Sequence, residues 1–207
     1  RMGIRIGDLL DWEALVPMVT QVLEHKNALI TKVYGGKALA LDDVLAKCRI
    51  WADHMAPYAM ATEQLVQDLL GQNKRVLLEG AQGTLLDIDH GSYPYVTSSS
   101  PSIGGACTGL GLNPQAIKGV LGVFKAYSTR VGSGPMPSEI TDDEAEEIRE
   151  KAQEFGVTTG RARRIGWFDG VAAKYSQLIN GFTGIVLTRL DILDEFDSVK
   201  VCVGYEV

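Results

Sequence analysis

The sequence has few cysteines, no long apolar run and no excess of positive charge, and each absence excludes a class of protein. The three cysteines, Cys48, Cys107 and Cys202, are odd in number and lack metal-site spacing, so we expect reduced thiols in a cytoplasmic protein. No apolar stretch could span a bilayer and no signal peptide opens the chain, so we expect no membrane partner. The formal net charge of −6 argues against a nucleic-acid partner, although it is compatible with a small basic site.

The sequence also lacks the phosphate-binding motif GxxxxGK[ST], and it begins with Arg1 rather than methionine. Its last segment, VKVCVGYEV, has the pattern of a strand with no cap after it. We therefore expect a piece of a longer chain, in which any phosphate loop of this type lies upstream or is missing.

Residues 1–72 are expected to form a mostly helical subregion. Helices are predicted there over residues 8–34, 41–55 and 62–71 because apolar residues recur at helical spacing. Pro17 is expected either to kink the first helix or to split it.

Residues 73–207 carry short apolar runs alternating with helical patterns. Strands are predicted at residues 75–80, 93–99, 119–132, 184–191 and 199–207. Helices are predicted from a capping box at Thr141 and Glu144 to Phe155, ended by Gly156, and from about Trp167 to Leu178. This alternation indicates a single α/β domain, with a largely parallel sheet flanked by helices and ligands at the carboxyl ends of its strands. The irregular span over residues 91–114 is long for a loop, which is typical of function or disorder.

The segment VTTGRARR, residues 157–164, concentrates positive charge and backbone freedom in an acidic chain. Gly160 lets backbone N–H groups approach a ligand, and the forks of Arg161 and Arg163 match carboxylate or phosphate oxygens. An anion-binding loop is one interpretation. The other is a solvated basic loop that pairs with the acidic helix before it.

Two strand ends carry candidate recognition groups. Gln82 follows the run at 75–80, and its amide can donate to a carbonyl oxygen and accept from a ring N–H. Asp191 ends LTRLD, where a carboxylate can accept hydrogen bonds from the N1–H and N2–H₂ of guanine. The alternatives are a turn with a polar tip and an aspartate that caps the next turn.

The segment DIDHG carries two candidate chemical features. His90 can be a catalytic imidazole or a structural loop histidine. Asp87 and Asp89 are two carboxylates without a third metal ligand, so they do not define a metal site.

Four segments together resemble signature regions of the adenylosuccinate synthetase family, in that family's order: GAQGTLLDIDHGSYPYVTSS, KAYSTRVGSGPMPSE, FGVTTGRARRIGWFD and LTRLD. The resemblance implies an α/β fold related to P-loop GTPases and a homodimer. It implies a carbon–nitrogen ligase of purine biosynthesis that joins IMP to L-aspartate. GTP, with Mg²⁺, first phosphorylates the 6-oxygen of IMP, and the aspartate amine then displaces the phosphate.

The resemblance also implies roles for individual residues. The IMP positions are Arg1, lent across the dimer interface, Gln82 near the 6-oxygen, Thr97 at the 5′-phosphate, Val131 against the ribose, and Arg161. The aspartate loop is Val157, Thr158, Thr159, Gly160, Arg161 and Arg163, and the GTP positions are Arg163, Arg189, Leu190 and Asp191.

The family's glycine-rich loop, catalytic aspartate and histidine, and Mg²⁺ ligands match nothing in this sequence, so we expect them upstream and predict no activity from this chain alone. Ala162 stands where some relatives carry another basic residue. The alternative to an enzyme is a non-catalytic nucleotide-binding or dimerisation module that keeps the IMP half-site.

Overall fold

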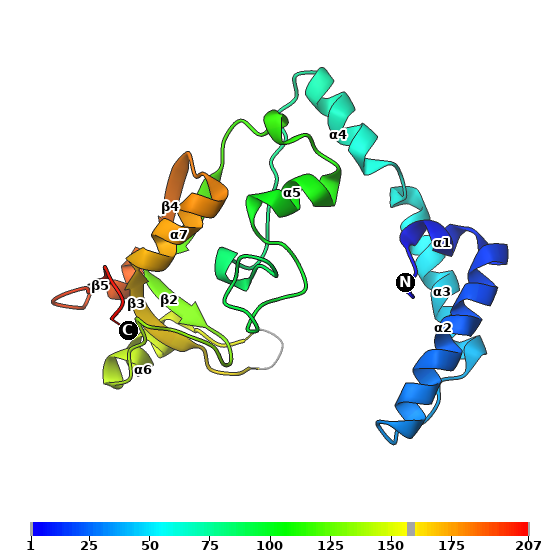
Figure 1. Cartoon of the computed structure of the whole chain (residues 1–207), viewed down its shortest axis with the longest axis horizontal. Coiled ribbons are helices and arrows are strands. Elements are labelled where there is room, and N and C mark those ends of the chain that lie inside the picture. Colours follow the sequence, from blue (N-terminus) through cyan, green and yellow to red (C-terminus); the bar gives the residue numbers. More distant parts are fainter. Residues whose placement is uncertain (1, 157–159, 207) are drawn as a thin grey trace. The chain divides into compact units, whose positions relative to one another are not determined.

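The computed structural model describes residues 2–156 and 160–206. The chain divides into two compact units, Arg1–Ala61 and Thr62–Val207, drawn in Figure 1. The helical subregion predicted over residues 1–72 extends one helix beyond the first unit. That the whole chain acts as a single domain stays a prediction.

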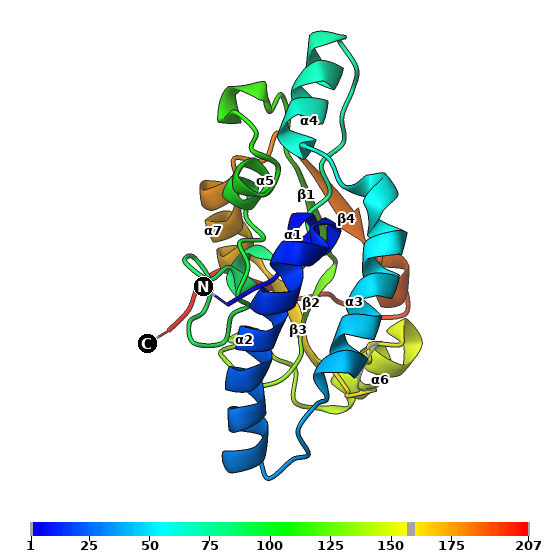
Figure 2. The same ribbon diagram turned by 90° about the vertical axis from the view of Figure 1, so that its right-hand side faces the viewer.

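The first unit is helical, as predicted. It contains α1 (Ile6–Leu10), α2 (Trp12–Lys32), α3 (Leu41–Met55) and the short 3₁₀ helix η1 (Ala56–Tyr58). Helices α2 and α3 lie side by side in Figure 2 and enclose a small core of Leu9, Leu15, Val19, Cys48 and Ala52.

The break between α1 and α2 falls at Asp11, not at Pro17. The Asp11 side chain accepts a hydrogen bond from the backbone N–H of Ala14 (3.1 Å) and so caps the start of α2. Pro17 then lies inside a continuous helix. Of the two predicted outcomes, the split at Pro17 is wrong, because the cap sets the boundary.

The second unit contains two small sheets. Strands β1 (Leu121–Lys125) and β4 (Gly184–Thr188) pair in parallel. Strand β3 (Arg164–Asp169) pairs antiparallel with β2 (Tyr127–Arg130) and parallel with β5 (Val201–Cys202). The α/β class with largely parallel strands is therefore confirmed.

Strands β1 and β2 follow each other along the chain but are divided by a bend at Ala126, where the pairing partner changes. The N–H of Ala126 still donates to the carbonyl of Thr188 (2.8 Å), and pairing with β3 begins at the next residue. The single long strand predicted over residues 119–132 is wrong: the segment forms two shorter strands in different sheets, because the chain bends at Ala126.

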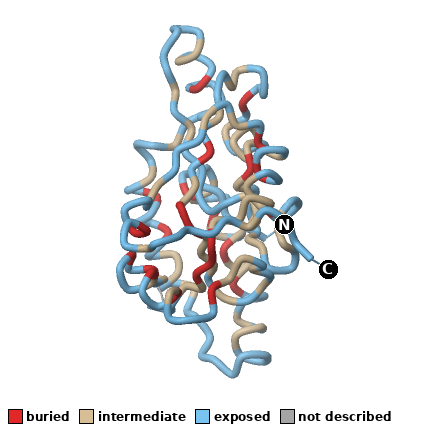
Figure 3. Tube along the Cα trace, turned by 90° about the vertical axis from the view of Figure 1, so that its left-hand side faces the viewer, coloured by how far each residue is buried: buried red, intermediate tan, exposed pale blue. Residues whose placement is uncertain are grey.

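Four α-helices accompany the sheets: α4 (Thr62–Gly71), α5 (Ile103–Leu110), α6 (Asp143–Ala152) and α7 (Gly170–Asn180). The 3₁₀ helices are η2 (Thr84–Leu86), η3 (Pro114–Ala116) and η4 (Leu190–Leu193). The core of this unit joins α6, β2, β3 and η4 around Tyr127, Ile148 and Ile165, and Figure 3 marks its buried positions. Within residues 2–156 and 160–206 no helix is long and apolar enough to cross a membrane.

Two predicted strands do not form within the described residues. Residues 75–80 and 93–99 pair with no other strand, and Leu77 remains 87% exposed. An apolar run becomes a strand only where a partner supplies the ladder of hydrogen bonds, and these runs have none here.

Three predicted boundaries around residues 141–180 are wrong. Asp142, not Thr141, caps α6, because its carboxylate accepts from the N–H of Glu144 (3.2 Å). Helix α6 ends at Ala152, because Gln153 adopts a left-handed conformation (φ +54°) before Phe155 is reached. The segment RIGWFD is strand β3, and α7 begins only after it.

Candidate functional site

The segment over residues 82–99, which includes η2, brings the predicted IMP-binding residues Gln82 and Thr97 to a third side chain, Ser99. The Ser99 hydroxyl lies 2.8 Å from the Thr97 hydroxyl, and it donates to the Gln82 side-chain oxygen over 3.4 Å. The N–H of Thr97 donates to the carbonyl of Leu86 (2.8 Å). Gln82 itself has φ +66°, a left-handed backbone that side chains other than glycine rarely adopt. An amide and two hydroxyls thus form a small polar group on the surface.

This loop folds around the buried carboxylate of Asp87. One oxygen accepts from the N–H groups of Asp89 (2.9 Å) and His90 (3.2 Å). The other accepts from the hydroxyl (2.6 Å) and N–H (3.2 Å) of Ser102. The Ser102 bond is the main cause that lowers the pKa of Asp87 to about 2, although burial opposes it. Asp87 is therefore a structural anchor, and its oxygens are already occupied by donors.

Helix α7 fixes the same loop from its other side. The Asn180 amide donates to the Thr84 hydroxyl (2.9 Å), and its oxygen accepts from the N–H of Ile103 at the start of α5 (2.8 Å). The Tyr175 hydroxyl donates to the carbonyl of His90 (2.8 Å), so this histidine has a backbone role in the loop. Hydrogen bonds from Asn180 and Tyr175 of α7 therefore hold the loop that carries the polar group at Gln82.

Arg130 joins this loop to the end of β2. Its guanidinium donates to the Ser92 hydroxyl and the Tyr95 carbonyl, both at 3.0 Å, and to the carbonyl of Ser133 at 3.1 Å. The next residue is Val131, the predicted ribose contact, which is 53% exposed. Arg130 thereby ties the end of β2, next to Val131 in the chain, to the loop that leads to Thr97.

A second polar group surrounds the buried side chain of Glu154, just after α6. Its Oε1 accepts from Lys125 Nζ (2.6 Å) and the Tyr127 hydroxyl (2.7 Å), and its Oε2 accepts from Arg163 (2.6 Å). We call these four residues the Glu154 cluster. Burial raises the pKa of Glu154, but the bonds from Lys125, Tyr127 and Arg163 outweigh it, and the pKa lies below its usual value. Burial, reinforced by the bond to this carboxylate, raises the pKa of Tyr127.

The predicted aspartate loop follows Glu154 closely in the sequence, and its last residue, Arg163, belongs to the Glu154 cluster. Phe155 and Ala162 form an antiparallel bridge at its base, and the N–H of Gly156 donates to the carbonyl of Arg161 (2.8 Å). Gly160 has φ +63°, a conformation that glycine adopts without strain. Arg161 is exposed.

Four predicted site residues lie outside the described part of the chain: Arg1, Val157, Thr158 and Thr159. Of the two interpretations of the basic loop, pairing with acidic groups is observed for Arg163 with Glu154, and for Arg164 with Glu139. Such pairing does not by itself exclude anion binding by the rest of the loop.

The predicted guanine segment follows the carboxyl end of β4. Arg189 adopts a left-handed conformation (φ +63°) and precedes η4, in which Leu190 is 55% exposed. Arg189 and Asp191 both act electrostatically on Tyr127, the former lowering and the latter raising its pKa. The segment therefore lies near the Glu154 cluster.

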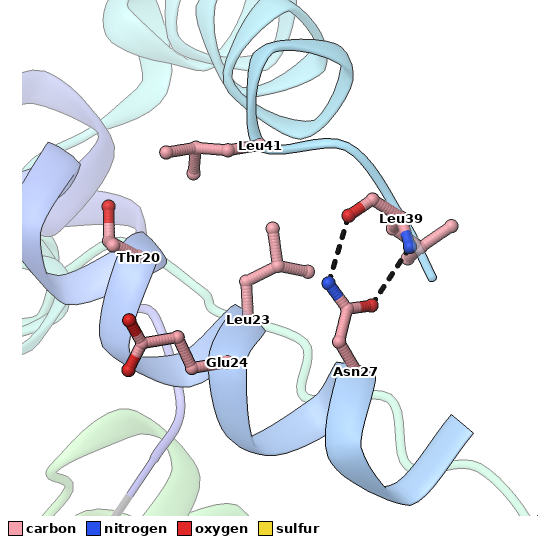
Figure 4. A pocket seen from close by; sticks show the side chains of 6 residues that line it. All are labelled: Thr20, Leu23, Glu24, Asn27, Leu39 and Leu41. Atoms are coloured by element: carbon pink, nitrogen blue, oxygen red, sulfur yellow. Dashed lines mark hydrogen bonds between the residues drawn. The ribbon is translucent and has the colours of Figure 1, made fainter. Parts of the chain in front are cut away.

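Each of the two units has a surface hollow among its described residues. One, of about 250 Å³, lies between α2 and α3, where Asn27 donates to and accepts from the backbone of Leu39, both at 2.9 Å (Figure 4). The other, of about 440 Å³, lies along α7 beside Tyr175 and Leu178. Neither is lined by a residue predicted to bind a ligand.

The described residues contain no group of three histidine, cysteine or acidic side chains that could hold a metal ion. Sequence reasoning missed Ser99, Lys125, Tyr127 and Glu154. Of these four residues, only Glu154 could have been suspected from the sequence, because it is an acidic residue close to the basic loop. Nothing in the sequence indicates that its side chain is buried.

Comparisons with known proteins give a consistent result. The family model described as adenylosuccinate synthetase matches residues 1–207. The chain is 49% identical over 207 residues to an adenylosuccinate synthetase of Dehalococcoides mccartyi, and 50% identical over 209 residues to one of Thermomicrobium roseum. Both alignments cover 100% of this chain, but only 49% and 48% of those proteins, so the chain spans about half of their length.

A solved structure gives the same picture. The fully ligated adenylosuccinate synthetase from Plasmodium falciparum superimposes with a TM-score of 0.89 at 36% identity. The superposition covers 96% of this chain and 46% of that one.

Proposed function

Because the chain belongs to the adenylosuccinate synthetase family, we propose that it takes part in joining IMP to L-aspartate at the expense of GTP. In the first step the γ-phosphoryl group of GTP passes to the 6-oxygen of IMP, which leaves GDP and 6-phosphoryl-IMP. In the second step the aspartate amine attacks C6, and phosphate leaves with that oxygen. The product is adenylosuccinate, and the reaction belongs to purine biosynthesis.

The observation that carries the proposal is the convergence of Gln82 and Thr97 on Ser99. A side-chain amide can hold the 6-oxygen and the adjacent ring N–H of hypoxanthine, which are the atoms that react. A hydroxyl suits the 5′-phosphate. Val131, beside the same loop, would then contact the ribose, and Arg161 would complete the IMP site.

The basic loop would bind L-aspartate. The side chains of Thr158 and Thr159 and the backbone of Val157 and Gly160 would meet its carboxylates together with Arg161 and Arg163. Arginine forks bind carboxylates through paired, charge-assisted hydrogen bonds, which also fix the orientation of the attacking amine.

GTP would lie beside the Glu154 cluster. Asp191 would accept from the N1–H and N2–H₂ of guanine, with Arg189 and Leu190 against the base. Arg163 would contact GTP as well as aspartate. Mg²⁺, held by residues other than those described, would neutralise charge on the phosphates of GTP.

The active form would be a cytoplasmic homodimer. The family resemblance is the basis for the dimer, in which Arg1 would match an arginine lent across the interface, and the reduced cysteines expected from the sequence are the basis for the cytoplasm. Sedimentation of the purified protein at several concentrations measures the oligomeric state directly.

The test is a calorimetric titration of the chain with IMP, alongside an assay of adenylosuccinate formation by the longest protein that its gene encodes. Saturable binding that Arg161→Ala abolishes is expected, whereas Lys174→Ala, which removes an exposed cation on α7, should bind normally. The 207-residue chain alone should not turn over, because the electrostatic stabilisation of phosphoryl transfer needs groups it lacks. IMP binding without synthesis by the longest protein would instead indicate a non-catalytic nucleotide-binding or dimerisation module.

A further inference from the structure

The buried carboxylate of Glu154 needs an explanation beyond stability. Its side chain is only 2% exposed, and removing an ionised carboxylate from water is costly unless it is paired and hydrogen-bonded. Three donors from three segments meet that need: Lys125 from β1, Tyr127 from β2 and Arg163 from the basic loop. An apolar side chain would fill the same space without this cost.

What the carboxylate achieves is to fix Arg163 at several points. The N–H of Arg163 donates to the carbonyl of Glu154 (3.0 Å), and the carbonyl of Arg163 accepts from the Arg149 side chain (2.9 Å). One terminal nitrogen of its guanidinium is held by Glu154 at 2.6 Å. Both the backbone and the head group of this arginine are therefore set by the core.

One donor of the guanidinium is left without an acceptor. The Arg163 side chain is 26% exposed, and its buried Nε–H has no hydrogen-bond partner among the described residues. A buried donor without an acceptor costs about 1–3 kcal/mol, so an incoming oxyanion would satisfy it. The edge formed by Nε and the second terminal nitrogen matches the two oxygens of a carboxylate.

The charges of the Glu154 cluster also favour the binding of an anion. Glu154 is negative while Lys125 and Arg163 are positive, so the group keeps one net positive charge for an anion. Without Lys125 the carboxylate would cancel the charge of the arginine that it holds.

Resting on the function proposed above, we propose that Glu154 is the positioning residue that presents Arg163 to the aspartate carboxylate. Glu154 does not touch the substrate. It transmits the position of strands β1 and β2 to the basic loop, so that the guanidinium is oriented before L-aspartate arrives. Such preorganisation lowers the entropy cost of binding and orients the attacking amine.

The experiment is a steady-state comparison of Glu154→Gln with wild type in the longest protein that the gene encodes. Glutamine replaces one acceptor oxygen by an NH₂ group that faces donors, although it leaves the cluster more positive. If charge alone mattered, the KM for L-aspartate would fall. If positioning matters, the KM for L-aspartate should rise roughly tenfold or more, while the KM for IMP stays within about twofold of wild type.

Two further variants keep the test decisive. Tyr127→Phe removes one donor and keeps the carboxylate, so it should raise the aspartate KM by about twofold to fivefold even if Glu154→Gln fails to fold. Glu150→Gln makes the same substitution at an exposed position on α6 and should change neither KM.

The outcomes separate the two proposals. Wild-type synthesis with an unchanged or lower aspartate KM in the variants overturns the positioning role alone. An equal rise in both KM values, matched by a lower unfolding midpoint, also overturns it, because it indicates a merely structural role. If the wild type makes no adenylosuccinate, the proposed function fails and the inference falls with it.

Discussion

Replacement of Asp87 by asparagine is the substitution whose effect follows most directly from the structure. Each carboxylate oxygen accepts two hydrogen bonds: one takes the N–H groups of Asp89 and His90, and the other takes the hydroxyl and N–H of Ser102. An asparagine side chain has a single oxygen. Whichever way it turns, its NH₂ group must face two donors.

The size of the effect follows from the pKa. The hydrogen bonds, that of Ser102 first, lower the pKa of Asp87 from 3.8 to about 2 against the opposing effect of burial. Since one pKa unit corresponds to about 1.4 kcal/mol, the ionised carboxylate stabilises the folded state by about 2 kcal/mol. We expect Asp87→Asn to lower the free energy of unfolding at neutral pH by about 2–3 kcal/mol.

The pH dependence provides a second check. Because the folded-state pKa lies below the unfolded value, this stabilisation is complete above pH 3.8 and is lost as the pH falls through about 2. Urea unfolding followed by circular dichroism, at pH values from about 7 down to about 2, should show the difference between wild type and variant shrinking as the pH falls below about 4. Asp89→Asn, at an exposed position in the same loop, is the control. The reasoning would be refuted if both variants lost the same free energy of unfolding, or if the difference between wild type and Asp87→Asn did not change with pH.

Three other predictions concern the same unit. Gly105→Ala should destabilise it by several kcal/mol or prevent folding, because the new Cβ would lie 1.7 Å from the carbonyl oxygen of Ser100. Gly104→Ala, in the same helix but with nothing within 4 Å, should instead stabilise it by about 0.5–1 kcal/mol in thermal unfolding. Asn180→Leu should cost about 2–4 kcal/mol, since it leaves the N–H of Ile103 on α5 without its acceptor and the Thr84 hydroxyl on η2 without its donor; a loss below about 0.5 kcal/mol would contradict this. Arg130→Lys should weaken IMP binding more than it lowers the unfolding midpoint, because a point charge cannot keep the four hydrogen bonds of the guanidinium; calorimetry beside thermal unfolding measures both.

Helices α3 and α4 could be predicted well because their signals are local, whereas α5 lies within the span expected to be irregular. Helices α3 and α4 begin and end where the periodicity of residues 41–55 and 62–71 places them. Strands were harder, because pairing depends on distant segments. Residues 75–80 have the composition of a strand but no partner here, and Phe168 fits a helical pattern although it pairs in β3.

The residues of the candidate site also differ in how far the sequence alone suggests them. The basic loop and the segment after β4 could be proposed as binding segments from the sequence, because their residue types are typical of anion binding and of base recognition. Glu154 could not, because its place after an acidic helix suggests a solvated side chain. Only the tertiary structure shows that Lys125 and Tyr127 reach it from another part of the chain.

The change of partner at Ala126 has a consequence for folding. Lys125 ends β1 and Tyr127 begins β2, and both donate to the same oxygen of Glu154. A slip of one residue along this segment would move both donors away from Glu154 and misalign both sheets together. Formation of the two sheets and assembly of the anchor for the basic loop are then one cooperative event, in which a misregistered chain loses its fold and its site at once.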